Sequence, residues 1–317
     1  MINYSIVLAL LLVMALVYYK LADRLNIIDK PNHRSSHDTL TIRGGGILFF
    51  LAVLCFFVAS NFSYPYFVLG VSLISIVSFV DDLISLSPKI RLFFQVAAVL
   101  LICYQIGWET IPLWAYLPVL IIAMGFMNIF NFMDGINAIT GLCALVVLGS
   151  FYYLNEQITV VEPDLLIYTF MAVVVFAFFN FRKKALMFAG DIGSISMAVI
   201  LLFVGILLII KTGSILVIGL YGVYAADAVY TIFYRIYLKE KLAEAHRHHI
   251  YQKLVDNFGL SHMRVSLMYA GLQLLINCLI IYVILNVELS YHIFIGVAIA
   301  LFLLLIYIQV FKWNEKR

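Results

Sequence analysis

The stretch "SFVDDLISLSPKIR" (residues 78–91) separates two apolar runs and carries two adjacent aspartates. The carboxylates of Asp81 and Asp82 repel each other, and each is costly to remove from water. The flanking runs are of the length with which a helix enters a bilayer. The stretch therefore predicts the end of one membrane-spanning helix and the start of the next, and it raises the question of what two carboxylates do there.

The composition indicates that lipid covers part of the protein. Of 317 residues, 65% are apolar and 12% are charged, against about 25% charged in soluble domains. The mean hydropathy is +1.07. A net charge of +3 is too small to indicate a nucleic-acid partner, so the expected surroundings are a lipid bilayer and no nucleic acid.

Apolar runs of membrane-spanning length recur along the whole chain. We expect an all-α, polytopic integral membrane protein with about eleven transmembrane helices, in a single domain over residues 1–317. The expected spans are 2–19, 46–62, 65–80, 90–107, 114–132, 137–154, 165–181, 192–210, 214–231, 263–286 and 289–311.

The positive charges lie on one side of this predicted topology. With the N-terminus outside, every Lys and Arg except Lys211 falls in alternate loops or in the C-terminal tail. The positive-inside rule then assigns that side, and the C-terminus, to the cytoplasm. The cytoplasmic loops are expected at 20–45, 81–91, 128–137, 181–194 and 232–262.

The polar motifs gather in those same five loops. A pore or carrier would place polar residues near the midplane and on both sides; only Asp227, inside an expected span, hints at that alternative. Polar residues at one interface indicate chemistry between a dissolved compound and a membrane-held one.

The residue types in these loops suit phosphoryl transfer. Asp and Asn oxygens are ligands for Mg²⁺, with Mn²⁺ as a substitute. Lys, Arg and His side chains suit anionic oxygens. The oxygen donors are Asp81, Asp82, Asn128, Asn131, Asp134 and Asp191, and the basic groups are Arg43, Lys89, Arg91, Arg247 and the histidines of residues 246–249.

Each motif also has a simpler structural interpretation. The paired aspartates could be solvated helix-end charges, and Asp134-Gly135 could form only a turn. Asp191 could be only a helix N-cap. The histidines could form a solvated patch or a zinc site, although no zinc motif accompanies them. Asp227 could pair with a cation from another helix or line the site.

Five motifs in order carry a family resemblance. They are "TIRGGG" (41–46), "DDLISLSPKIR" (81–91), "NIFNFMDGIN" (128–137), "FAGDIGS" (188–194) and "AHRHHIYQKL" (245–254). With them the chain resembles the polyprenyl-phosphate N-acetylhexosamine-1-phosphate transferases, which include phospho-N-acetylmuramoyl-pentapeptide transferase.

The resemblance implies a reaction and its location. A UDP-N-acetyl-sugar would give its sugar-1-phosphate to undecaprenyl phosphate and release UMP, at the cytoplasmic face of a bacterial inner membrane. This would be the first membrane step of a cell-envelope polysaccharide such as O-antigen. The resemblance does not select the sugar, which could be GlcNAc, GalNAc or a 6-deoxy sugar such as FucNAc or QuiNAc. The expected partners also include a second copy of the chain, in a homodimer.

The resemblance also places the site residues. The metal ligands would be Asp191 and Asn131. The catalytic set would be Asp81, Asp82, Asp134, His246, His248 and His249, and the substrate-binding set Arg43, Lys89, Arg91, Asn128, Asn137 and Phe188. Asn137 departs from the second aspartate found in many members, and Leu40 and Ile42 replace prolines common before the glycine run.

Overall fold

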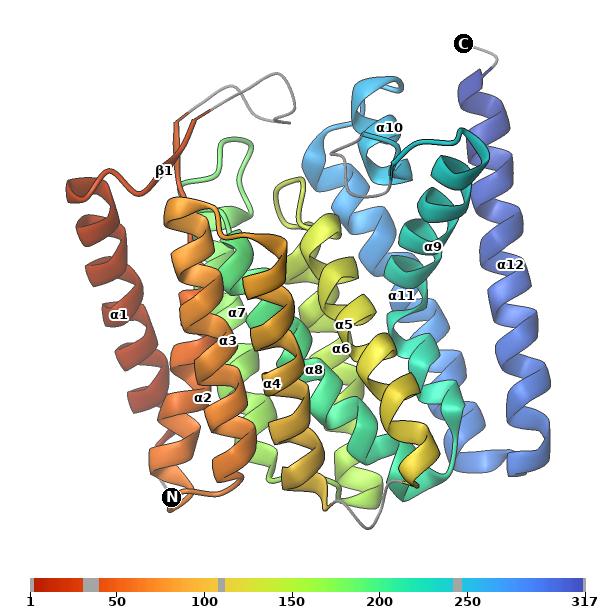
Figure 1. Cartoon of the computed structure of the whole chain (residues 1–317), viewed down its shortest axis with the longest axis horizontal. Coiled ribbons are helices and arrows are strands. Elements are labelled where there is room, and N and C mark those ends of the chain that lie inside the picture. Colours follow the sequence, from red (N-terminus) through yellow and green to blue (C-terminus); the bar gives the residue numbers. More distant parts are fainter. Residues whose placement is uncertain (1–2, 31–39, 108–111, 242–246, 316–317) are drawn as a thin grey trace.

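The protein is a bundle of long helices that run roughly parallel to one another (Figure 1). The computed structural model describes residues 3–30, 40–107, 112–241 and 247–315. Within these ranges, ten helices are long and apolar enough to cross a membrane. The predicted all-α membrane architecture is thereby confirmed. A shorter apolar helix, Ile47–Ala59, runs beside them, and helix α1 begins and α12 ends at opposite ends of the bundle (Figure 1).

The element bounds follow the predicted spans closely. In chain order they are α1 (Tyr4–Arg24), β1 (Ile28–Asp29), β2 (Thr41–Ile42), α2 (Ile47–Ala59), α3 (Pro65–Ile84), α4 (Pro88–Ile106), η2 (Leu113–Ala115), α5 (Tyr116–Met133), α6 (Ile139–Ile158), α7 (Pro163–Asn180), α8 (Gly190–Thr212), η3 (Ile215–Tyr221), α9 (Gly222–Tyr237), α10 (Ile250–Asp256), α11 (His262–Asn286) and α12 (Leu289–Glu315). The loop expected at 81–91 is shorter than predicted, because α3 continues through both aspartates to Ile84, and its C-cap Ser85 has a φ of 48°.

Helix α2 is shorter than the span expected at 46–62. Its 13 residues measure about 20 Å at 1.5 Å per residue, less than the roughly 30 Å of a bilayer core. It begins at Ile47, one residue after the expected start, and ends at Ala59, three residues before the expected end, ahead of Asn61 and Phe62 with their positive φ values. At its start, Gly46 packs against the first turn of α8: a Cβ on Gly46 would lie 2.2 Å from the α-carbon of Gly193. The chain before α2 therefore enters the bundle as a loop that is covered by protein.

The span expected as one helix at 214–231 is divided into η3 and α9. Side chains from α11 satisfy the backbone at the break. Gln273 accepts a hydrogen bond from the Val223 amide (2.8 Å) and donates one to the Gly219 carbonyl (3.1 Å). Backbone groups within a membrane need such partners. This break is filled by protein, so it does not supply the paired broken helices of the transporter alternative.

Helix α8 is the central element. It packs against α2, α3, α5 and α6, and its first turns are rich in small residues (Gly193, Ser194, Ser196, Ala198) that are buried. Small residues allow close helix approach in membranes. The N-terminus of α8 is therefore held at the meeting point of several helices.

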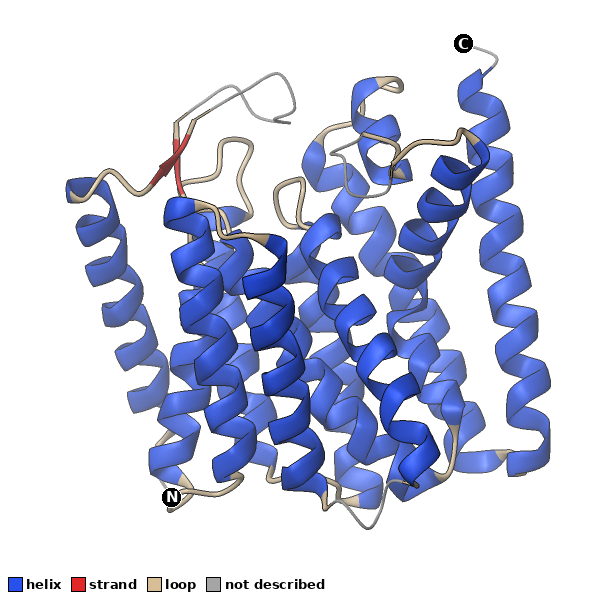
Figure 2. Ribbon diagram, viewed as in Figure 1, coloured by secondary structure: helices blue, strands red, loops and turns tan. Residues whose placement is uncertain are grey.

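A two-residue ribbon joins two of the polar loops. Strands β1 and β2 pair antiparallel, and Ile42 also bridges in parallel to Met187. The ribbon lies at the same end of the bundle as α10 (Figure 2). Because Ile42 pairs on both sides, the segment before α2 is tied to the segment before α8.

Candidate active site

The glycine run lies against the start of α8. The amide of Gly45 donates to the Phe188 carbonyl (2.8 Å), and that of Gly46 donates to the Ala189 carbonyl (3.0 Å). Gly190 has a φ of 72°, and a Cβ there would lie 2.6 Å from a carboxylate oxygen of Asp82. Only glycine combines that conformation with that clearance. The "TIRGGG" and "FAGDIGS" motifs therefore form one unit.

Asp82 anchors the N-terminus of α8. Its two oxygens accept hydrogen bonds from the amides of Asp191 (2.9 Å) and Ile192 (3.1 Å). Arg43 Nε lies 2.7 Å from Oδ1, and the Asp82 side chain is 0% exposed. A carboxylate at this position satisfies free helix amides and complements the helix dipole. The geometry gives Asp82 an anchoring role; its catalytic role stays a prediction.

Asp191 is the carboxylate that faces the opening of this cluster. Its side chain is 19% exposed, and Arg43 Nη2 lies 3.3 Å from its Oδ1. The Asp81 carboxylate and the Asn131 amide are near enough to act on it electrostatically. Two neighbouring carboxylates repel each other, so the arrangement favours a bound cation or a shared proton between Asp81 and Asp191.

The surrounding residues hold this cluster in place. Asn131 Nδ2 donates to Ser194 Oγ (3.2 Å) in α8. Asp81 forms an ion pair with Arg91 (3.2 Å), which is in the first turn of α4. Burial alone would lower the pKa of the Arg43 guanidinium, but the charges of Asp82 and Asp191 outweigh it, so the pKa of Arg43 is raised. Arg43 is therefore a permanent cation of the cluster.

Asp134 lies at the end of α5, beside this cluster. It is half-buried, and burial raises the pKa of its carboxyl to about 6, with a further rise from the Asp191 charge. The nearby Thr140 hydroxyl and the Arg43 charge partly oppose this rise of the pKa. Asp134 therefore titrates closer to neutrality than a solvated aspartate does.

Two of the three histidines each contact a carboxylate. His249 Nδ1 lies 3.2 Å from Asp227 Oδ1, and His248 Nε2 lies 3.0 Å from Glu240 Oε1. His246 lies outside the described residues. Asp227, for which pairing with a cation and lining the site were both left open, contacts the His249 ring. The pKa of the Glu240 carboxyl is lowered, chiefly by Arg235 and then by His248.

The histidine segment is attached to the end of α5. The Tyr251 hydroxyl donates to the Phe132 carbonyl (3.0 Å), and a Cβ on Gly135 would lie 2.0 Å from that hydroxyl oxygen. The "DG" step after α5 thus packs directly on Tyr251. Three elements, α3, α5 and α8, together with the glycine run and the α10 segment, bring four of the five motifs and the His249 side of the fifth to one end of the bundle.

Four predicted substrate-binding residues lie at the edge of this cluster or away from it. Asn128 is exposed and donates to the Met124 carbonyl of its own helix (2.9 Å). Asn137 is buried and donates to the Arg182 carbonyl (2.9 Å). Lys89 is exposed and Phe188 is half-buried. Their roles toward a substrate stay predictions, and the contacts of Asn137 indicate a loop-bracing function.

Sequence reasoning missed Glu240 and Tyr251 and left the role of Asp227 open. A carboxylate inside an apolar span is itself a signal, because burying a charge without a partner is costly. Tyr251 carries no such signal, since Tyr residues are abundant in this chain. Its importance depends on a contact with a residue 119 positions away.

The donor set fits Mg²⁺ better than a metal held entirely by protein. Among the residues that the structure describes, no group of three or more His, Cys, Asp or Glu side chains could hold a metal ion. Asp81 and Asp191 with the Asn131 amide offer two carboxylates and one neutral group. Mg²⁺ typically binds through one or two carboxylates and completes its shell with water and substrate phosphates.

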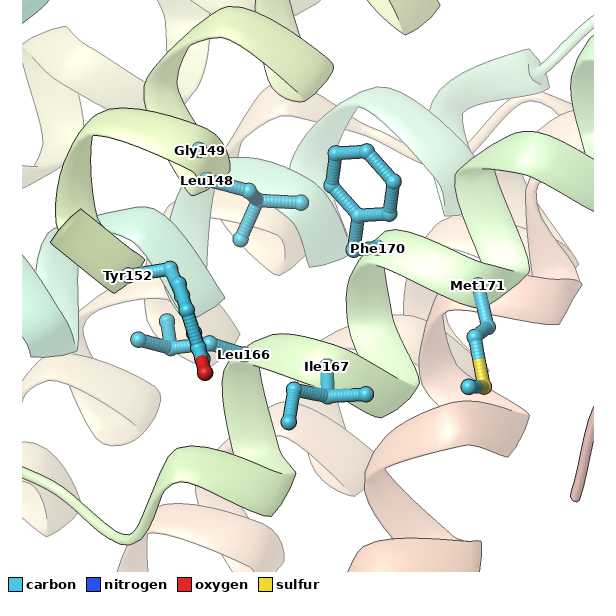
Figure 3. Close-up of a pocket in the computed structure, with 7 residues that line it drawn as sticks. All are labelled: Leu148, Gly149, Tyr152, Leu166, Ile167, Phe170 and Met171. Atoms are coloured by element: carbon cyan, nitrogen blue, oxygen red, sulfur yellow. The ribbon is translucent and has the colours of Figure 1, made fainter. Parts of the chain in front are cut away.

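A separate pocket of about 400 Å³ lies between α6 and α7. Figure 3 shows its lining side chains, which carry no charge: Leu148, Gly149, Tyr152, Leu166, Ile167, Phe170 and Met171. The second half of α6 and the first half of α7 form it, so it is remote from the polar end of the bundle. An apolar lining suits hydrocarbon, and this pocket is not a nucleotide site.

Comparisons with known proteins agree with the motifs. Residues 64–209, which contain α3 and most of α8, match the family model described as glycosyl transferase family 4. The resemblance to the polyprenyl-phosphate N-acetylhexosamine-1-phosphate transferases is confirmed, and the chain is related to that family.

Three curated relatives illustrate the relationship. The chain is 25% identical over 294 residues to a "probable undecaprenyl-phosphate N-acetylglucosaminyl 1-phosphate transferase" of Bacillus subtilis (81% of this chain, 78% of the relative). It is 29% identical over 196 residues to an "undecaprenyl-phosphate alpha-N-acetylglucosaminyl 1-phosphate transferase" of Yersinia pestis (55% and 53%). It is 27% identical over 197 residues to a "phospho-N-acetylmuramoyl-pentapeptide-transferase" of Streptococcus thermophilus (54% and 57%). The alignments with the latter two span little more than half of each relative.

Proposed function

We propose that the protein transfers an N-acetylhexosamine-1-phosphate from a UDP-sugar to undecaprenyl phosphate and releases UMP. An oxygen of the lipid phosphate attacks the sugar-linked phosphorus, and the bond from that phosphorus to the UMP oxygen breaks. One phosphoanhydride replaces another, so no separate energy source is needed. The observation that carries the proposal is the convergence of Arg43, Asp81, Asn131 and Asp191 at one end of a membrane bundle.

The difficulty of this reaction is the approach of two anions. Arg43 is a fixed cation beside Asp191, and Arg91 lies beside Asp81. Asp81, Asp191 and Asn131 would hold Mg²⁺, or Mn²⁺ in its place, and the ion would neutralise charge on the phosphate oxygens. The phosphate monoester is largely ionised at neutral pH because its second pKa is about 6. Positioning by these residues therefore contributes more than proton removal.

The two substrates come from different phases. The nucleotide sugar is dissolved, whereas the prenyl chain is held by the bilayer that surrounds the apolar helices. The positive-inside pattern favours a cytoplasmic site in a bacterial inner membrane. The product would be the first lipid-linked intermediate of a cell-envelope polysaccharide such as O-antigen. The protein would act as a monomer or as a homodimer.

The test is transfer by purified protein from a panel of UDP-N-acetyl-sugars to undecaprenyl phosphate, with Mg²⁺, with Mn²⁺ and after chelation. Asp191→Ala should abolish transfer while the protein stays folded. Asp164→Ala is the matched control, because Asp164 bonds the Tyr4 hydroxyl at the opposite end of the bundle. Turnover by Asp191→Ala close to that of the control would remove Asp191 from the site, and UMP release that persists after chelation would exclude the metal.

A further inference from the structure

We propose that Asp227 is a positioning residue of the transfer site: it holds the His249 imidazole in the tautomer that carries the proton on Nδ1. The proposal rests on the function proposed above. Asp227 is fully buried within the span formed by η3 and α9, so its charge must be compensated by specific partners.

The partners of Asp227 surround its carboxylate. Oδ1 accepts from the Ile250 amide (3.0 Å) and lies 3.2 Å from His249 Nδ1. Oδ2 accepts from the Tyr269 hydroxyl (2.6 Å) and from the Tyr251 amide (3.3 Å). The Thr231 hydroxyl lies 3.3 Å from Oδ1. A buried carboxylate with this number of donors is well compensated.

These contacts decide the tautomer of His249. An ionised carboxylate only accepts hydrogen bonds, so the proton of the His249–Asp227 contact must lie on Nδ1. A neutral imidazole carries one ring proton, which makes Nε2 the acceptor nitrogen. The partner of one ring nitrogen thus decides whether the other nitrogen donates or accepts. The same holds for metal-bound histidines.

Asp227 also sets the position of the histidine segment relative to the α5 motif. Its two backbone contacts fix the start of α10, where the His249 and Tyr251 rings stack with centroids 5.5 Å apart. The Tyr251 hydroxyl then reaches the Phe132 carbonyl, two residues before Asp134. A shift of the Asp227 carboxylate would therefore move His249 relative to the cluster around Asp191.

The same arrangement occurs at Asp82. The Asp82 side chain on α3 and Asp227 on α9 are both buried, both accept from two consecutive backbone amides at the start of a helix, and both contact one basic side chain. Asp82 holds the helix start that presents Asp191, and Asp227 holds the one that presents His249. Two carboxylates thus position the two halves of the site.

The test combines kinetics with the ¹⁵N NMR signals of the histidine ring nitrogens in the full-length protein. His249→Gln identifies the His249 signals by their loss. We expect wild-type His249 to be protonated at Nδ1, and Asp227→Asn to lose this preference. The variant should also lose roughly 10²-fold in kcat, with KM for the UDP-sugar changed by less than about threefold.

Tyr269→Phe separates positioning from stability. It removes one buried hydrogen bond to Asp227 but leaves the His249 contact in place, so Tm should fall while the Nδ1 signal persists. If kcat falls in the same proportion to the loss of Tm in Asp227→Asn and in Tyr269→Phe, the role of Asp227 is purely structural. If Asp227→Asn does not fold, the wild-type spectrum still decides, because His249 protonated at Nε2 would overturn the proposal. Absence of transfer by wild-type protein would refute the proposed function, independently of the tautomer signal.

Discussion

The contact between Gly46 and Gly193 predicts a large effect of a single methyl group. In Gly46→Ala, the new Cβ would lie 2.2 Å from the α-carbon of Gly193 and 2.9 Å from the Ala189 carbonyl oxygen. Ordinary contact begins at 3.4 Å, so α2 and α8 must separate by about 1 Å. Backbone atoms on both sides leave no flexible side chain to give way. Overpacking of this kind costs about 1–3 kcal/mol.

The same separation reaches the site. Arg43, three residues before Gly46, lies 3.3 Å from Asp191, and Asp191 lies between the two residues that Gly46 contacts, Ala189 and Gly193. A displacement of about 1 Å at reacting groups can cost roughly 10²-fold in rate. We therefore expect Gly46→Ala to lower both the Tm in detergent and the initial rate of transfer.

Gly125→Ala is the matched control. Gly125 lies inside α5, and a Cβ there would meet no heavy atom within 4 Å. Alanine gains up to about 1 kcal/mol in helix propensity over glycine, so Tm should stay the same or rise and the rate should not change. A Gly46→Ala protein with the Tm and rate of the Gly125→Ala protein would refute the close contact and the placement of the glycine run.

Three further predictions concern the carboxylates. Asp82→Asn should lower the free energy of unfolding by about 2–3 kcal/mol, since it leaves a buried backbone amide unsatisfied and weakens the pair with Arg43. Asp81→Asn should cost less stability, because it relieves repulsion with Asp191. Equal Tm changes in the two variants would contradict this. The raised pKa of Asp134, about 6, means that the folded state holds more protons than the unfolded state between pH 4 and 6, so stability should fall as pH rises through that window, by on the order of 2–3 kcal/mol. Asp134→Asn should remove that slope in pH-dependent thermal melts, and an unchanged slope would show that another group causes it. Chelation should stop wild-type transfer without lowering Tm by more than a few degrees, because protein groups alone satisfy the Asp82 carboxylate: two backbone amides and Arg43.

The spans and the polar face could be predicted from the sequence because both depend on local properties. A bilayer requires apolar helices of a certain length, so the runs define α1, α3 to α8, α11 and α12 to within a few residues. The exceptions are α2 and the break between η3 and α9. The break depends on a partner far along the chain, Gln273, and α2 ends early, ahead of the positive-φ residues Asn61 and Phe62.

The residue types of the site were also visible in the sequence, but their division of labour was not. The adjacency of Asp81 and Asp82 suggests a joint role, yet successive residues of a helix point in different directions, and the two carboxylates meet different partners. Asp82 turns into the protein and binds the amides of α8, while Asp81 pairs with Arg91 at the start of α4. Asp227 shows the same limit. Its cost in the membrane is a property of the sequence, but its pairing with His249 exists only because the chain after α9 folds back onto the bundle. Hydrophobicity is counted along the chain and so determines the spans, whereas hydrogen bonds and ion pairs act over about 3 Å in space and are decided by the tertiary structure.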